Sequence, residues 1–343
     1  KCHFVSMKTA TKWNAHTIYI GPGKGGTVRF KKCTFKDGFA EGNTFTTGIY
    51  HKGGTLRVED CTFDTMYSRS NGGAIFSDSE AEALYVEGCT FENCSEGLAS
   101  APTPATGGGA IGATVPYVFI SKSTFDTCKT SENSGYGSAI RLMANNTSQI
   151  ADIFDCKFLN CEAFGKGTVS IYGGTCTVSR CVFTGNTAKS GSAISSDHAM
   201  SVMNISDCSF TDNNATQNDW PSNIQPGGTV YLNGINNEIL RCAFTNNTVA
   251  ACGSAILLYG NMNSGIQTGL VDRCVFTGGS DGRGGTVYFD AKYGSLLVRN
   301  SLFENNATTA ETSPAIAVRM SGPETQVDDC TFVGNGSSTK NND

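Results

Sequence analysis

The fold is decided by a stretch that reads Ile205-Ser206-Asp207-Cys208-Ser209-Phe210-Thr211-Asp212-Asn213. Its Cys-x-Phe core, or a close variant, recurs from one end of the 343-residue chain to the other. The phenylalanine stands at Phe4, Phe35, Phe63, Phe91, Phe125, Phe158, Phe183, Phe210, Phe244, Phe276, Phe303 and Phe332. The intervals average roughly 30 residues, and a period of about 20 to 50 residues is typical of a solenoid, a propeller or another repeat array.

Apolar residues mark three strand segments in each repeat. The Phe segment is one, and a Gly-rich turn followed by Ile or Val, as in Gly72-Gly73-Ala74-Ile75, begins another. Within each segment apolar and polar residues alternate, which is the period of a strand with one buried face. The third segment has an apolar residue three positions before the Cys-x-Phe slot, in the order Phe30, Val58, Val86, Ile120, Ile153, Val178, Ile205, Ile239, Val271, Val298 and Val327.

The step of three residues from Ile205 to Cys208 breaks the strand period, so both side chains can face inward only if the chain turns a corner between them. Asp, Arg, Lys, Gly and Asn occupy these positions, as turn chemistry requires. The pattern predicts an all-β, single-stranded parallel β-helix of about twelve coils with three strands per coil. A propeller blade needs about 40 to 45 residues, more than these repeats offer. No linker interrupts the repeat, so we expect one domain over residues 1–343. The same pattern also fits a segment of a longer chain.

The Gly-Gly-Ala-Ile segment at 72–75, paired with Phe-x-x-Asn, resembles the repeat of the chlamydial polymorphic outer membrane proteins (Pmp). Relatives of that family are right-handed parallel β-helices, so the resemblance implies the right-handed form, display at a cell surface, and adhesion. The sequence departs from the motif in the other coils: Cys94, Cys128 and Cys161 replace the Asn in three of them, and Met or Gly replaces it in the rest. Phe-x-x-Asn itself occurs at Phe183/Asn186, Phe210/Asn213, Phe244/Asn247, Phe303/Asn306 and Phe332/Asn335.

Composition limits the partners. The formal net charge is −5 and the basic residues are scattered singly, which argues against nucleic acid. No apolar run approaches the roughly 20 residues that span a bilayer, so we expect no direct membrane insertion. We expect no cofactor and no metal, because the chain has no Cys-x-x-Cys and its four His are dispersed. An extracellular or cell-surface location is expected, with other protein subunits, joined end to end or laterally, and glycans as partners.

Ten of the fifteen cysteines occupy the Cys-x-Phe slot, and Ser123 and Ser301 fill it in two other coils. The exchange of Cys for Ser indicates a slot for a small side chain, and we expect a buried ladder of thiols packed as small hydrophobes. Stacking in register would also bring Cα atoms to about 4.8 Å, inside the range of a disulfide. Disulfides therefore stay open as an alternative, with Cys94, Cys128 and Cys161 as candidates.

Eight Asn-x-Ser/Thr sequons occur. Asn204 lies between two inward residues and should point to solvent, so we predict glycosylation there, at Asn214, and at one of Asn145 and Asn146, if the host is eukaryotic. Two further sequons begin in the Asn slot of the repeat, where an inward amide would bond to neighbouring backbone and carry no glycan. These are Asn306 and Asn335.

We expect functional residues in the loops that are longer than those of the minimal coil. The two longest insertions are about residues 94–108 and 214–227. The second contains Asp219 and Trp220, a carboxylate beside an indole that could anchor a sugar or a protein. A Trp folded back to cover its own loop explains the same residues equally well.

An enzyme acting on polysaccharide would need paired carboxylates or an Asp/Arg cluster on one outer face. The candidate acids occur singly or at predicted corners. The least implausible catalytic pairs are Asp197-His198 and Asp281/Arg283. We therefore expect a secreted or cell-surface structural or adhesive protein within an extracellular assembly, not an enzyme. The alternatives are a stand-alone glycan-binding adhesin and a polysaccharide lyase or hydrolase. The candidate acids are Asp197, Asp272, Asp281, Asp328 and Asp329.

Overall fold

The computed structural model describes residues 2–9, 16–40, 46–69, 71–97, 107–131, 135–144, 148–217, 227–260, 267–291, 293–309, 314–319 and 324–337. Throughout these ranges the regular structure is β-strand, without a helix. The chain divides into two compact units, Lys1–Cys176 and Thr177–Asp343, each of which is described by itself. The single domain expected from the sequence stays a prediction.

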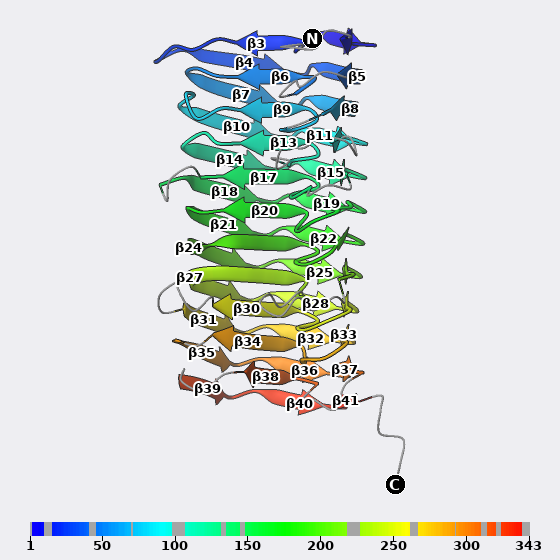
Figure 1. The fold of residues 1–343 in the computed structure, drawn as a ribbon, viewed down its shortest axis with the longest axis vertical. Coiled ribbons are helices and arrows are strands. Elements are labelled where there is room, and N and C mark those ends of the chain that lie inside the picture. The colour runs from blue at the N-terminus through cyan, green and yellow to red at the C-terminus, as the bar shows by residue number, and fades with distance from the viewer. Residues whose placement is uncertain are drawn as a thin grey trace. The chain divides into compact units, whose positions relative to one another are not determined.

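Unit 1 builds its first sheet from the Phe segments, one strand per coil (Figure 1). All pairs are parallel and in register, with Phe35 opposite Phe63 and Phe63 opposite Phe91. The rings stack with centroids 4.6 to 5.0 Å apart. The strands are β1 (His3–Val5), β5 (Thr34–Ala40), β8 (Thr62–Ser68), β11 (Thr90–Glu92), β15 (Thr124–Asp126) and β19 (Lys157–Leu159).

The other two predicted strands of each coil are also present in unit 1. The strands that begin at the Ile or Val after the Gly-rich turn are β3 (Ile18–Ile20), β6 (Ile49–His51), β9 (Ile75–Ser77), β13 (Ile111–Ala113), β17 (Ile140–Met143) and β20 (Val169–Tyr172). The strands before the Cys slot are β4 (Thr27–Lys31), β7 (Thr55–Glu59), β10 (Ala83–Glu87), β14 (Tyr117–Ser121) and β18 (Ile150–Phe154), with β21 (Thr175–Ser179) at the division between the units. Two-residue strands follow the Phe segment at β2 (Lys8–Thr9), β12 (Ser95–Glu96) and β16 (Lys129–Thr130).

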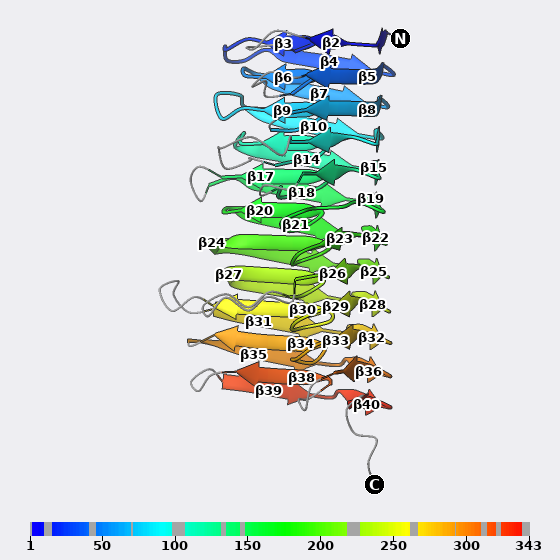
Figure 2. The ribbon, with the colours of Figure 1, turned by 45° about the vertical axis from the view of Figure 1, so that its right-hand side comes forward.

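Unit 2 repeats the plan (Figure 2). Its Phe strands are β22 (Val182–Thr184), β25 (Ser209–Thr211), β28 (Ala243–Thr245), β32 (Val275–Thr277), β36 (Leu302–Glu304) and β40 (Thr331–Val333). The other faces contain β30 (Ile256–Gly260), β31 (Gln267–Asp272), β34 (Val287–Ala291), β35 (Gly294–Arg299), β38 (Ile316–Arg319) and β39 (Glu324–Asp328). The short strands are β23 (Thr187–Ala188), β26 (Asn214–Ala215), β29 (Thr248–Val249), β33 (Ser280–Asp281), β37 (Ala307–Thr308) and β41 (Gly336–Ser337).

Two details differ from the predicted coil of three strands. In unit 2, β24 (Ile194–Ser206) and β27 (Val230–Leu240) each run through two faces as one long strand, so the predicted corner between those faces is absent there. The short strands after the Phe segment add a fourth element to most coils. The parallel β-helix itself, with twelve Phe-bearing strands among the described residues, is confirmed.

The predicted ladder forms the core of each unit. Phe35, Phe63 and Phe91 are fully buried, as are Phe125, Phe158, Phe183, Phe210, Phe276 and Phe303, and Phe244 is nearly so. The Ile and Val positions before the corner are buried in the same way, from Val58 to Val298. Phe332 is 47 % exposed, because no described strand pairs with β40 on the side away from β36. Inward side chains of one type therefore pile up in register, as the repeat predicts.

The corner predicted between the two inward residues Ile205 and Cys208 is made by a left-handed backbone residue, Asp207 with φ of 56°. Asn, Asp and Gly tolerate this conformation best, which explains their frequency there. The position before the Cys slot is left-handed at Lys32, Asp60, Gly88, Lys122, Asp155, Arg180, Asp207, Arg241, Arg273, Asn300 and Asp329. A second left-handed corner lies two residues after Phe, at Asp37, Thr65, Asn93, Thr127, Asn160, Gly185, Asp212, Asn246, Gly278, Asn305 and Gly334.

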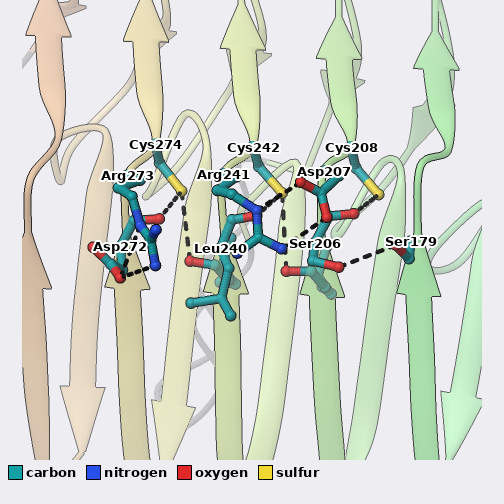
Figure 3. Close-up of polar contacts among 12 residues, drawn as sticks. Ser179, Ser206, Asp207, Cys208, Leu240, Arg241, Cys242, Asp272, Arg273 and Cys274 are labelled. Carbon is teal, nitrogen blue, oxygen red and sulfur yellow. Dashed lines mark hydrogen bonds and ion pairs between the residues drawn. The ribbon is translucent and has the colours of Figure 1, made fainter.

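The Cys slot is a hydrogen-bonding position as well as a small one. Figure 3 shows the thiols of Cys208, Cys242 and Cys274 on successive coils of unit 2, each on the same side of its strand. The Sγ of Cys242 donates to the carbonyl of Leu240 at 3.4 Å. Ser301 Oγ donates to Arg299 in the same way at 2.8 Å. The expectation of thiols packed only as small hydrophobes was therefore incomplete, and the shared bond explains why Ser replaces Cys.

Buried Asn side chains form a second ladder in unit 2. Asn213 Nδ2 donates to the carbonyl of Phe183 at 3.0 Å and to Asn247 Oδ1 at 3.0 Å. The predicted inward amides of Asn306 and Asn335 are confirmed, since Nδ2 donates to Phe276 at 3.0 Å and to Phe303 at 2.8 Å, respectively.

In unit 1 the Cys residues at this slot contact the equivalent carbonyls. Cys94 Sγ donates to Phe63 at 3.6 Å and Cys128 Sγ to Phe91 at 3.7 Å. The replacement of Asn by Cys therefore preserves the bond to the Phe of the preceding coil.

Candidate functional site

A pocket lies on the outer face of unit 1, over β7, β10 and β14. These three strands are neighbours in the sheet (Figure 1). The pairing register puts Arg57, Tyr85 and Phe119 in one outward column. The cavity has a volume of about 260 Å³. It is lined by Arg57, Val58, Glu59, Tyr85, Glu87, Tyr117 and Phe119, and we call it the Tyr85 pocket.

Three aromatic rings form the apolar wall of the Tyr85 pocket. The ring of Tyr85 lies 5.6 Å from that of Tyr117 and 6.1 Å from that of Phe119, tilted by 55° and 42°. All three are half-buried, while their strand neighbours Leu84 and Val118 point into the core. Strand alternation therefore places aromatic side chains outward, where surface positions are usually polar. Aromatic side chains that line a concave surface are typical of a ligand-binding pocket.

Charged side chains surround the rings. The guanidinium carbon of Arg57 lies 3.9 Å from the centre of the Tyr85 ring, a cation–π contact. Glu59 Oε2 accepts a hydrogen bond from Arg29 and lies 3.3 Å from the ammonium of Lys31. The bond from Arg29 holds the pKa of the Glu59 carboxyl below its usual value. Glu59 is therefore ionised and neutralised by its neighbours.

The opposite rim is neutralised in the same manner. Glu87 accepts from the ammonium of Lys122 at 2.9 Å. The hydroxyl of Tyr117 donates to Asp152 at 3.2 Å. Burial, and then the charge of Asp152, raises the pKa of Tyr117, so its phenol stays protonated. The Tyr85 pocket thus offers aromatic faces, carboxylate acceptors and a guanidinium donor, the groups that bind a polyhydroxylated ligand.

A second feature is a pair of carboxyl groups that face inward. The position five residues after Phe falls in the short strand, and Glu96 and Asp281 occupy it in two coils. They are 1 % and 2 % exposed. The other coils have small or neutral residues there: Ala40, Ser68, Thr130, Ala163, Ala188, Ala215, Val249, Thr308 and Ser337.

Asp281 caps a turn. Its Oδ1 accepts the backbone N–H groups of Arg283 at 3.1 Å, Gly284 at 2.8 Å and Gly285 at 3.1 Å. Burial raises the pKa of Asp281, and these amides oppose the shift. The contact between Asp281 and Arg283, which the sequence offered as a possible catalytic pair, includes a hydrogen bond from the backbone amide of Arg283. This bond stabilises a turn, so it has a structural role.

Glu96 has no such cap. Among the described residues neither carboxyl oxygen has a hydrogen-bond partner. Burial raises the pKa of Glu96 to about 7, and the backbone amides of Gly107 and Asn71, which lie near the carboxyl without bonding to it, oppose the shift. Nearby, burial raises the pKa of Tyr67 to about 12 and the charge of Glu96 adds to it. Near neutral pH Glu96 is therefore a mixture of the protonated and ionised forms.

Two of the predicted acids are less exposed than expected. Asp272 and Asp281 lie at turns, as the sequence predicts, but both side chains are buried. Asp272 forms ion pairs with Arg273 and Arg299, whose guanidinium nitrogens are 3.1 and 3.3 Å from Oδ2. Figure 3 shows the pair with Arg273. Asn300 donates to its other oxygen at 2.9 Å, and these bonds lower the pKa of Asp272.

The remaining acid candidates are dispersed. Asp197 and His198 lie in β24, where His198 Nδ1 accepts the amide of Met200 at 3.2 Å. Asp328 and Asp329 lie at the end of β39. Gln326 donates to Asp328 at 2.6 Å.

Several predicted sites fall outside the described residues. These are Asp219, Trp220, Asn145 and Asn146. The other predicted glycosylation sites are described: Asn214 is exposed in β26, and Asn204 is half-buried in β24. Their glycosylation stays a prediction.

All fifteen cysteines are thiols in the structure. Cys94, Cys128 and Cys161 are completely buried, and burial raises the pKa of Cys128 and Cys161 well above the usual value. A disulfide among the three therefore stays a prediction, to be tested on protein from an oxidising compartment.

The Tyr85 pocket was missed from the sequence, although a signal was present. Arg57, Tyr85 and Phe119 each stand four residues before the Cys slot, at Cys61, Cys89 and Ser123. Aligning the repeats on that slot would have placed them in one column.

Two absences hold for the described part of the chain. No helix there is long and apolar enough to cross a membrane. Within the same ranges no cluster of three or more His, Cys, Asp or Glu side chains could hold a metal ion.

Comparison with known proteins gives one match. The family model described as a right-handed β-helix region matches residues 16–200 and, again, residues 138–332. No curated protein and no solved structure matches the chain.

Proposed function

Because the chain belongs to the right-handed β-helix family, we propose that it is a secreted or surface-displayed adhesive protein that binds carbohydrate through the Tyr85 pocket. The observation that carries this proposal is the column of outward aromatic rings flanked by Arg57 and by two ion-paired carboxylates. The Pmp-like repeat supports display at a cell surface. Other subunits of an extracellular assembly are proposed as further partners.

The chemistry of the pocket suits a sugar. Pyranose rings present C–H groups on their flat faces, which pack against aromatic faces, and hydroxyls at their edges, which donate to carboxylates. Tyr85, Tyr117 and Phe119 supply the first surface, and Glu59 and Glu87 supply acceptors at its rim. A cavity of about 260 Å³ lies just below the range of about 300 to 1,000 Å³ typical of small-molecule pockets. It therefore fits one residue of a longer glycan.

Binding accounts for these residues better than hydrolysis. A glycosidase needs one carboxyl group with a raised pKa to protonate the leaving group. In the Tyr85 pocket the pKa of Glu59 is lowered, and Glu87 is paired with Lys122. Glu96 and Asp281, two carboxyl groups whose pKa is raised, are buried inside the coils. We therefore place adhesion ahead of a polysaccharide lyase or hydrolase.

A glycan array probed with the purified chain tests the proposal. We expect binding to a restricted set of glycans, at least tenfold weaker in Tyr85→Ala and Tyr117→Ala. The matched control is Tyr293→Ala, which removes a 53 % exposed tyrosine from unit 2. Thermal melts should show that the three variants remain folded. An array without specific signals, or equal loss in the control, would refute carbohydrate binding at this pocket.

A further inference from the structure

We infer that the sugar residue in the Tyr85 pocket is anionic and that its carboxylate or sulfate pairs with Arg57. This inference rests on the proposed function and specifies its ligand class. It depends on the charges around the pocket and on the orientation of one guanidinium group.

Both carboxylates that line the pocket are ion-paired. Glu59 is held by Arg29 and Lys31, and Glu87 by Lys122. Asp152, the next residue of the outward column after Phe119, keeps its charge but accepts a hydrogen bond from the Tyr117 hydroxyl at 3.2 Å. An anion that enters the pocket therefore meets lining carboxylates, Glu59 and Glu87, that already have cationic partners.

Arg57 is the one charged lining residue without an ion pair among the described residues. Its described contact is with the ring of Tyr85. A cation–π contact uses the flat face of the guanidinium and leaves the N–H groups in its plane able to donate. Those N–H groups form the planar fork that binds a carboxylate or a sulfate through two parallel hydrogen bonds. The contact with Tyr85 thus holds the guanidinium group of Arg57 at the aromatic wall of the pocket.

The aromatic wall and the fork are close enough to serve one sugar residue. Arg57 lies over Tyr85, and Tyr85 contacts both Tyr117 and Phe119. A ring packed on the aromatic wall would place an acidic substituent toward Arg57. A neutral sugar would gain the ring contact but not the ionic one. The charge of the ligand should therefore decide affinity, and the aromatic contact should be common to both.

The experiment uses pairs of probes that differ only in charge: trigalacturonate and its methyl ester, sialyllactose and lactose, and a heparin disaccharide and its desulfated form. Calorimetric titration into the full chain should give at least tenfold tighter binding of the acidic member of one pair. High salt should reduce the difference, because it screens the ion pair. Arg57→Gln should abolish the preference while retaining binding of the neutral member. Tyr117→Ala should weaken both members.

Two further variants complete the test. Arg57→Lys keeps the charge without the planar fork, and should recover only part of the preference. Lys32→Gln removes an exposed charge outside the pocket lining and should bind as the unaltered protein does. Equal binding of acidic and neutral members, or a preference that survives in Arg57→Gln, would overturn the inference while leaving carbohydrate binding intact. Failure of every probe, together with an empty glycan array, would instead reject the proposed function.

Discussion

Glu96 and Asp281 occupy the same slot of the repeat, five residues after Phe91 and Phe276, yet only Asp281 accepts backbone amides from a turn. One slot thus holds a capped carboxylate in unit 2 and an uncapped one in unit 1. The difference leads to opposite expectations for the two side chains.

Glu96→Gln should stabilise the protein at neutral and alkaline pH. The pKa of Glu96 is about 7 in the folded chain against an ordinary value of 4.5. The folded state therefore binds the proton more tightly than the unfolded state, and stability is lost as pH rises from about 4.5 to 7. The full penalty, on the order of 3 kcal/mol, applies above pH 7 and disappears below pH 4.5.

Urea denaturation at pH 4, 6 and 8 measures this effect. The expected gain of Glu96→Gln is largest at pH 8 and close to zero at pH 4. Glu92→Gln is the matched control, since it neutralises an exposed carboxylate on the preceding strand. A gain that does not vary with pH would show that Glu96 is ionised or protonated throughout the range.

Asp281→Ala should destabilise unit 2. The substitution removes the acceptor of three backbone amides, those of Arg283, Gly284 and Gly285. Buried donors without a partner cost free energy, and we expect a loss of about 2 to 4 kcal/mol in the free energy of unfolding. Asp281→Asn keeps an oxygen at the same place and should lose less. Equal stability of Asp281→Ala and the unaltered chain would contradict the capping role.

The sequence predicted the structural features that recur in every coil, but it did not predict the contacts that occur at only one place. The Phe ladder, the buried Val58 and the left-handed corner at Asp207 follow from a period of about 30 residues and from strand alternation. Arg57 and Tyr85 are 28 residues apart, and neither looks unusual within its own strand. Their contact exists only because the coils stack in register, so it required alignment of the repeats as well as their recognition.

The inward carboxyls were missed for a different reason. The three apolar segments of each repeat predict strands, but the short strand after the Phe segment has no apolar signature. Without that strand the alternation could not show that Asp281 faces the interior. Turn propensity correctly predicted that Asp281 lies near a corner. The burial of its side chain could be predicted only if the fourth strand was known.

Asn213→Ala should lower the stability of unit 2 by about 2 to 4 kcal/mol. The side chain donates to Phe183 and Asn247 and accepts from both the amide and the side chain of Asn186. Asn213→Cys should lose less, because Cys94 at this slot in unit 1 bonds the corresponding Phe carbonyl. Asn236→Ala, an exposed position on β27, is the control. Equal effects at the two sites, measured by urea denaturation, would show that the ladder adds no stability.

Substitutions of Cys242 distinguish the size of its slot from its hydrogen bond. Cys242→Ser should stay within about 1 kcal/mol of the unaltered chain, because a hydroxyl can replace the thiol as donor to Leu240, as Ser301 does toward Arg299. Cys242→Ala is equally small but has no donor, so it should be less stable than Cys242→Ser in the same denaturation series. If the Ala variant equals or exceeds the Ser variant, the slot selects for volume alone and the carbonyl bond contributes nothing.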